Sequence, residues 1–363
     1  MVTRRSFLRT LGAGGLGLLS QSAAAGVGAD LEVGNLLMLG FTGHTIASDS
    51  AQILAEHLRT RRVAGVAFVK ENIGSRSDVE QLVSLFKEAA PQALIAIDHE
   101  GGAVQRLREQ HGFTSLPPAR WVAENMDLAQ SKAIYSQSAR DLAKAGFNIN
   151  LAPVVDLHDS ENPAVGRWGR AFNSDPSIVA RYAKDFIDAF AAEGVTCVLK
   201  HFPGHGRSKS DSHGDLPDIT ATWSEQELEP YIPLIQSGAA KIIMGGHLFH
   251  AKLSSDAIAT TLSRNVITNI LRNKLNFRGI IITDDIDMKA ISIQIGRRDA
   301  FLNAVAAGND IVVIRNANDF DPNLPQECAE WVLSAVSQSL LDARQIKDSS
   351  ARVAALRASI LSR

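Results

Sequence analysis

Short apolar runs rich in β-branched residues alternate with amphipathic segments, and this alternation constrains the fold more than any other feature of the chain. Most of the runs are continuously apolar, as expected for parallel strands that are buried on both faces. The eight runs cover residues 35–41, 63–69, 93–98, 148–157, 195–201, 240–247, 279–285 and 310–316.

The segments between the runs have the signals of helices. Residues 77–90 start with Ser and Asp and have apolar positions at helical spacing. Residues 176–194 open with proline at a first-turn position and end at glycine, and residues 263–275 are similar. Strand–helix alternation repeated eight times predicts a closed (β/α)8 barrel of the TIM type, with an open doubly wound sheet as the alternative. No linker interrupts the pattern, so we expect one domain over residues 30–363.

Composition excludes several classes of partner. Hydrophobic residues make up 45% of the 363 residues and the formal net charge is −2. Because no basic run follows the first ten residues, neither nucleic acid nor a membrane surface is an expected partner. Cys197 and Cys328 lie far apart in apolar surroundings, which predicts buried small hydrophobes rather than a disulfide.

Residues 1–25 have the three-part layout of a secretory signal: a charged start, a short apolar stretch and small residues before Gly26. The adjacent Arg4 and Arg5 in RRSFLR resemble a twin-arginine signal, which predicts transient contact with that export machinery and a periplasmic location. A chance basic start before an amphipathic helix is the alternative. The apolar stretch is shorter than the ~20 residues of a membrane-spanning helix, so we expect no stable anchor.

Unusual polar residues follow five of the predicted strands, in DHEGG, PVVDL, KHFPGHG, GGH and TDD. The carboxyl ends of barrel strands and the loops after them form the active site of such enzymes. The pattern therefore predicts that these polar groups meet at one mouth of the barrel.

Two acids leave the seventh strand. Asp284 and Asp285 follow four β-branched residues at 280–283, where a carboxylate can act as nucleophile or base. The alternative is a capping role, since an aspartate oxygen readily accepts a backbone N–H. With two acids in sequence, one is expected to cap while the other faces the mouth.

The fifth strand leads into the richest segment, residues 200–213. Lys200 and His201 end the strand, His205 lies in a glycine-shaped loop, and Asp211 and His213 follow. Their spacing lets the Asp211 carboxylate orient the His213 ring and stabilise its imidazolium. A structural hydrogen bond is the alternative for any single histidine, but is less favoured for the whole group.

Further charged residues follow the third and fourth strands. Asp98, Glu100 and Arg106 flank paired glycines, and Arg170 lies in GRAFNSDP. Carboxylates and arginine can hold sugar hydroxyls through bidentate hydrogen bonds. A salt bridge to a neighbouring acid is the alternative role for Arg170.

At these motifs the sequence resembles glycoside hydrolase family three, particularly its single-domain bacterial β-N-acetylglucosaminidases. The resemblance rests on IDHEGGAVQRL, NLAPVVDL, GRAFNSDP, KHFPGHG followed by DSH, and KLNFRGIIITDDIDM. It implies that Asp284 is the nucleophile and that Asp211 and His213 form the general acid/base dyad. The positions implied to hold the terminal sugar are Asp98, Arg106, Arg170, Lys200 and His201.

The implied reaction is a retaining double displacement that removes terminal β-linked N-acetylglucosamine from a small glycan such as a peptidoglycan fragment. No metal or organic cofactor is implied. The sequence departs from the family pattern at His99, Ala103 and Asn173, which bears on affinity and specificity. The open alternatives are a related β-glucosidase or glycosyl phosphorylase, a metal-dependent amidohydrolase and a non-catalytic sugar-binding protein.

Overall fold

The computed structural model describes residues 31–254, 258–317 and 319–361. Eight strands form one sheet in the order β10-β1-β2-β3-β6-β7-β8-β9, and their pairings are parallel. A parallel bridge between Ile282 and Ile311 joins the two ends of this order, so the sheet closes into a barrel. The strands are β1 (Leu37–Leu39), β2 (Gly65–Phe68), β3 (Leu94–Ile97), β6 (Ile149–Asn150), β7 (Thr196–Phe202), β8 (Ile242–Gly245), β9 (Ile280–Thr283) and β10 (Val312–Ile314).

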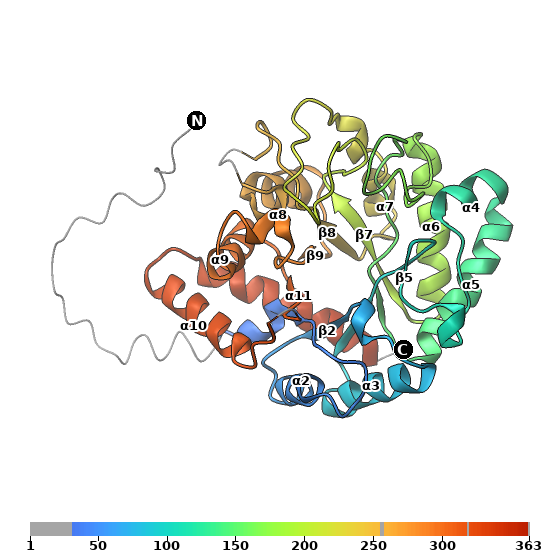
Figure 1. Cartoon of the computed structure of the whole chain (residues 1–363). Coiled ribbons are helices and arrows are strands. Elements are labelled where there is room, and N and C mark those ends of the chain that lie inside the picture. Colours follow the sequence, from blue (N-terminus) through green and yellow to red (C-terminus); the bar gives the residue numbers. More distant parts are fainter. Residues whose placement is uncertain (1–30, 255–257, 318, 362–363) are drawn as a thin grey trace, which may run out of the picture.

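Each predicted apolar run coincides with one of these strands, with β7 extending one residue beyond its run, so the (β/α)8 barrel is confirmed and the open sheet is wrong. Helices surround the barrel (Figure 1). They are α2 (Asp49–Arg59), α3 (Arg76–Ala89), α4 (Ala119–Asn125), α5 (Leu128–Lys144), α6 (Pro176–Ala192), α7 (Tyr231–Gln236), α8 (Lys289–Ser292), α9 (Arg297–Ala307), α10 (Leu324–Ser337) and α11 (Ala343–Leu361). Short helical segments are η1 (Val33–Leu36), η2 (Lys70–Asn72), η3 (Glu109–His111), η4 (Glu225–Leu228), η5 (Thr260–Leu262) and the π-helical η6 (Asn265–Lys274).

Local signals in the sequence account for where helices begin. The Ser75 side chain accepts a hydrogen bond from the Asp78 N–H and so caps α3. Asp175 caps α6 in the same way, and Pro176 occupies its first turn, where no N–H is needed. The predicted helices at 77–90 and 176–194 are therefore found within about two residues of their expected bounds.

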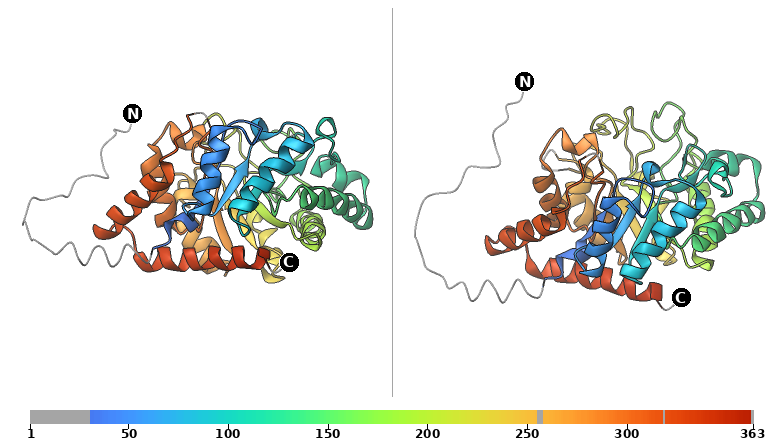
Figure 2. Two further views of the ribbon diagram at one scale, coloured as in Figure 1. Left: turned by 90° about the horizontal axis from the view of Figure 1, so that it is seen from below. Right: turned by 60° about the horizontal axis from the view of Figure 1, so that its bottom comes forward.

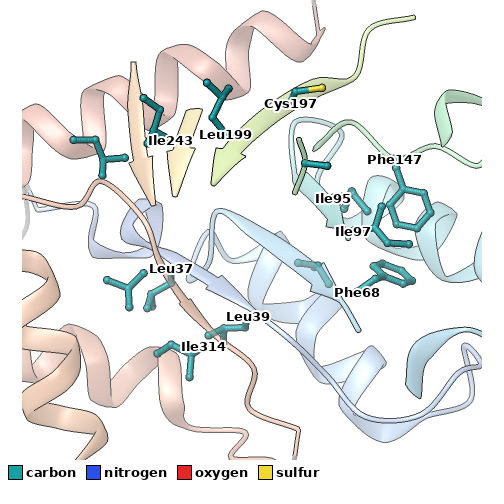
Figure 3. Close-up of a cluster of buried hydrophobic side chains, with 14 of the residues drawn as sticks. Leu37, Leu39, Phe68, Ile95, Ile97, Phe147, Cys197, Leu199, Ile243 and Ile314 are labelled. Carbon is teal, nitrogen blue, oxygen red and sulfur yellow. The ribbon is translucent and has the colours of Figure 1, made fainter. Parts of the chain in front are cut away.

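The strands separate two apolar layers, because successive side chains point to opposite faces. Met38, Leu94 and Ile282 belong to a cluster that fills the barrel. The outer layer packs the barrel against its helices, and Figure 3 shows part of it. Side chains labelled there include Leu37, Leu39, Phe68, Ile95, Ile97, Leu199, Ile243 and Ile314.

Helix α11 runs across one end of the barrel (Figure 2). Its Val353 joins the inner apolar cluster, and its Arg352 pairs with the buried Asp310, which lies two residues before β10. This contact places α11 at the amino ends of the strands. The carboxyl ends, where the polar motifs lie, are therefore at the opposite end.

Cys197 and Cys328 are buried free thiols, as predicted. In the described part of the chain no helix is long and apolar enough to cross a membrane. The predicted signal at residues 1–25 lies outside the described residues, so it stays a prediction.

Candidate active site

The loop after β3 forms a small hairpin that the sequence analysis did not predict. It pairs β4 (His99–Gly101) with β5 (Val104–Gln105). Gly101 turns with φ +106°, and a Cβ there would lie 2.4 Å from the Pro117 carbonyl, so only glycine fits. The Asn150 side chain bonds both the N–H and the carbonyl of His99. The hairpin thus holds Glu100 and Arg106 at fixed positions beside Asp98.

Asp98 lies between two cations. Its Oδ1 is 2.7 Å from the Lys200 Nζ, and its Oδ2 is 3.0 Å from the Arg106 Nη2. Burial alone would raise the pKa of Asp98, but the charges of Lys200 and Arg106 outweigh burial and hold that pKa well below its usual range. Asp98 is therefore ionised, and three of the predicted sugar-holding residues meet in one cluster.

Glu100 is a central acid of this cluster, although the sequence analysis did not include it among the site residues. It accepts two hydrogen bonds from Arg170, at 2.8 and 2.7 Å, and lies 2.7 Å from the Lys200 Nζ. Burial raises the pKa of Glu100, yet the Arg170 and Lys200 charges bring it below its ordinary value. Arg170 thus forms the salt bridge considered as its alternative role, and that bridge holds it in the cluster. The position of Glu100 between Asp98 and Arg106 in the motif was the available signal.

His201 is oriented by Asp156, a second residue that the sequence analysis did not select. The His201 Nδ1 is 2.7 Å from the Asp156 Oδ2, and the backbone N–H groups of His201 and His205 donate to Oδ1. Because the carboxylate can only accept, Nδ1 carries the proton, and Nε2 faces the Arg170 Nη2 at 3.4 Å. The Asp156 side chain is fully buried, and although burial raises its pKa, the neighbouring histidines lower it to about 2.

The two acids after β9 divide the roles that the sequence left open. The Asp285 Oδ1 accepts the N–H groups of Arg315 at 2.8 Å and Asp287 at 3.0 Å, so Asp285 is the capping acid. Asp284 is tied by its N–H to the Gly245 carbonyl, and its Oδ1 accepts the Asp285 N–H. Its Oδ2 accepts no hydrogen bond from the residues that the structure describes.

Charge also separates the two acids. Burial raises the pKa of Asp285 to about 7, with a further contribution from Asp287. Burial would raise the pKa of Asp284 as well, but the neighbouring His247, His201 and Lys200 outweigh it, and that pKa is lowered. Asp284 is therefore the acid that stays ionised at neutral pH with an oxygen available to react.

Asp211 and His213 meet as their spacing predicts. Both the backbone N–H and the Nδ1 of His213 lie 2.9 Å from the Asp211 Oδ1. This hydrogen bond raises the pKa of His213, and the negative charge of Asp284 contributes to the rise. The His213 side chain is 73% exposed, so the ring lies on an open loop at the mouth.

The residues at which the sequence departs from the family pattern lie in the loops after β3 and β6. His99 is buried in the first strand of the hairpin, and burial lowers its pKa to about 3, so the ring is neutral. The Asn173 Oδ1 accepts the Asp175 N–H, and the Ala103 carbonyl accepts a hydrogen bond from Arg108.

In the described part of the chain, no three His, Cys, Asp or Glu side chains are grouped as metal ligands would be.

Comparison with known proteins shows the family of the chain. Residues 29–356 match the family described as Glycosyl hydrolase family 3 N terminal domain. The chain belongs to glycosyl hydrolase family 3. This membership makes the protein a glycoside hydrolase and favours that prediction over the amidohydrolase and the non-catalytic binding protein.

Similar proteins of this family are known from several bacteria. A β-hexosaminidase of Xanthomonas oryzae pv. oryzae (strain KACC10331 / KXO85) is 34% identical over 290 residues, which are 77% of this chain and 83% of that protein. A β-N-acetylhexosaminidase structure from Beutenbergia cavernae has a TM-score of 0.78 at 28% identity, over 91% of this chain and 98% of that one. A family 3 β-N-acetylglucosaminidase from Paenibacillus sp. str. FPU-7 has a TM-score of 0.81 at 29% identity over 91% of this chain, which spans 62% of that protein.

Proposed function

We propose that the protein is a retaining exo-β-N-acetylglucosaminidase that removes terminal β-linked N-acetylglucosamine from glycans such as peptidoglycan fragments. The observation that carries the proposal is the pairing of an ionised strand-end carboxylate, Asp284, with the exposed Asp211–His213 dyad at the same mouth. The names of the similar proteins support a β-linked N-acetylhexosamine as the sugar.

In the first step, Oδ2 of Asp284 attacks the anomeric carbon, and the bond to the leaving oxygen breaks. His213, protonated at both nitrogens, donates its Nε2 proton to that oxygen. The proton on Nδ1 stays on the ring, in its hydrogen bond to the Asp211 carboxylate. The product is a covalent glycosyl-enzyme. In the second step, His213 takes a proton from water, the water oxygen bonds to the anomeric carbon, and Asp284 leaves as a carboxylate. Two inversions retain the configuration.

The charged cluster is suited to hold the terminal sugar. We assign this role to residues that lie in or beside the network around Lys200: Asp98, Arg106, Arg170, Lys200 and His201. Ion pairs fix these side chains before substrate arrives, so little conformational entropy remains to be lost on binding. Glu100 holds Lys200 and Arg170 in place.

Two related activities, β-glucosidase and glycosyl phosphorylase, are tested together with the proposed one. A panel of nitrophenyl glycosides should show turnover of the β-N-acetylglucosaminide at least about tenfold above the β-glucoside and β-xyloside, because one set of sugar contacts discriminates by roughly 1–3 kcal/mol. A higher rate on the glucoside would contradict the proposed sugar. A histidine acid/base, unlike a carboxylate, does not repel a phosphate anion, so the panel is repeated with inorganic phosphate. Formation of sugar 1-phosphate in place of free sugar would indicate a phosphorylase.

We further propose that the protein is exported through the twin-arginine pathway. Replacing Arg4 and Arg5 by lysine should keep the protein in the cytoplasm, because the pathway reads the arginine pair. The measurement is the distribution of enzyme between periplasmic and cytoplasmic fractions for the wild-type and doubly substituted chains. Unchanged recovery from the periplasm would rule out the twin-arginine signal.

A further inference from the structure

The loop that follows β8 carries a buried histidine that no step above uses. His247 is 1% exposed, and its Nε2 lies 2.8 Å from the Asp285 carbonyl oxygen. A carbonyl oxygen can only accept, so Nε2 carries the proton. Burial lowers the pKa of His247. With its proton on Nε2, the buried ring is thus a fixed donor to the backbone of Asp285.

That hydrogen bond is one link of a short chain that ends on the nucleophile. His247 donates to the Asp285 carbonyl, and the Asp285 N–H donates to the Asp284 Oδ1 at 2.8 Å. The Asp285 side chain is held separately by the N–H groups of Arg315 and Asp287. Holding the Asp285 backbone therefore limits the directions in which the Asp284 carboxylate can point.

The same loop also contacts the sugar-holding side of the site. The Gly246 N–H donates to the Phe202 carbonyl at 2.7 Å, and a Cβ on Gly246 would lie 3.0 Å from the His201 Cβ. The preceding Gly245 accepts the Asp284 N–H at 3.0 Å. The segment from Gly245 to His247 thus lies between the end of β7, which carries His201, and the end of β9, which carries Asp284.

We propose that His247 is a positioning residue that aligns the Asp284 carboxylate through the backbone of Asp285. The proposal rests on the proposed function, because it takes Asp284 as the nucleophile. Its Nδ1 is buried and has no hydrogen-bond partner among the described residues, so the hydrogen bond from Nε2 to the Asp285 carbonyl is the polar link of the ring to the site. His247 should therefore affect the rate of the chemical step rather than binding.

Three substitutions distinguish the effect of the hydrogen-bond donor from the effect of the volume of the ring. His247→Gln places an amide N–H where Nε2–H was, His247→Asn is too short to reach the Asp285 carbonyl, and His247→Leu removes the donor but keeps apolar bulk. We expect His247→Leu and His247→Asn to lower kcat by about 10- to 100-fold and to change KM by less than about threefold. A misplaced reacting group lowers the rate by up to about 10²-fold. Gln should stay within about threefold of wild type. The substrate is whichever nitrophenyl glycoside the wild-type enzyme hydrolyses fastest.

A second readout follows the bond-forming step directly. The rate at which a 5-fluoro glycosyl fluoride labels the enzyme, measured by intact mass, should fall in Leu and Asn but not in Gln. His250→Gln is the matched control, because His250 is a buried histidine of the same connection whose Nδ1 accepts the N–H groups of Lys252 and Leu253. It should lower Tm and leave kcat within about threefold.

Three results would each overturn the positioning role: equal losses of kcat in His247→Gln and His247→Leu, an unchanged kcat in His247→Leu, or a raised KM with unchanged kcat. If the Leu variant does not fold, the comparison of Gln with Asn decides, since equal kcat values in these two would also overturn it. A failure of the proposed sugar appears separately, as a wild-type enzyme that prefers another glycoside. A failure of the nucleophile assignment appears as an active Asp284→Ala variant, which overturns both proposals.

Discussion

Asp284→Ala is expected to lower turnover of the nitrophenyl N-acetylglucosaminide by a factor on the order of 10⁴ or more, the scale of loss when a nucleophile is removed. The fold should be kept, because among the described residues the Asp284 side chain accepts only the N–H of its own neighbour. Its lowered pKa means that the folded state stabilises the ionised carboxylate, so Tm should be equal or slightly lower. The measurements are kcat/KM and thermal unfolding of the same preparation.

Asp285 supplies the matched controls. Asp285→Ala leaves the half-buried N–H groups of Arg315 and Asp287 without their acceptor, at a cost of up to about 1 kcal/mol each, so its Tm should fall. Asp285→Asn keeps an oxygen at that place and should retain most of both Tm and turnover. Normal activity in Asp284→Ala with loss of activity at full stability in Asp285→Ala would mean that Asp285 is the nucleophile.

His213→Ala is expected to lose roughly 10²–10⁴ in rate on a natural disaccharide, the usual contribution of a general acid or base. Its loss of glycosylation rate on a dinitrophenyl glycoside should be much smaller, because that leaving group needs little protonation. Asp211→Asn should give a weaker form of the same pattern, since its carboxylate only orients the ring and raises its pKa. Pre-steady-state rates on both substrates provide the measurement.

The open loop gives this prediction a structural basis. With a side chain that is 73% exposed, His213 contributes little to the core, so its removal should leave Tm nearly unchanged. We expect the ring to swing over the sugar only when substrate is bound, as catalytic loops often do. Equal losses of glycosylation rate on both substrates would show that His213 is not the acid, and the role would pass to another group in the mouth.

The sequence by itself determined the barrel, because strands buried on both faces need continuous apolar runs and each run is followed by a helix. It located the strands better than their ends. The run at 148–157 contains only the short β6 (Ile149–Asn150), and beyond it Val154 pairs with Lys200 as an isolated parallel bridge. It also found the pairing of Asp211 with His213, which depends only on residues two apart.

The partners across the site were decided by tertiary structure alone. Glu100 meets Arg170 over 70 residues of chain, and Asp156 meets His201 over 45. Contacts between residues so far apart in sequence depend on how neighbouring strands close the barrel, and no local sequence pattern predicts them. The division between Asp284 and Asp285 is decided in the same way, because both carboxylates leave one strand. The backbone N–H groups of Arg315 and Asp287 lie where they make Asp285 the cap, and they leave Asp284 with an oxygen that accepts no hydrogen bond from the described residues.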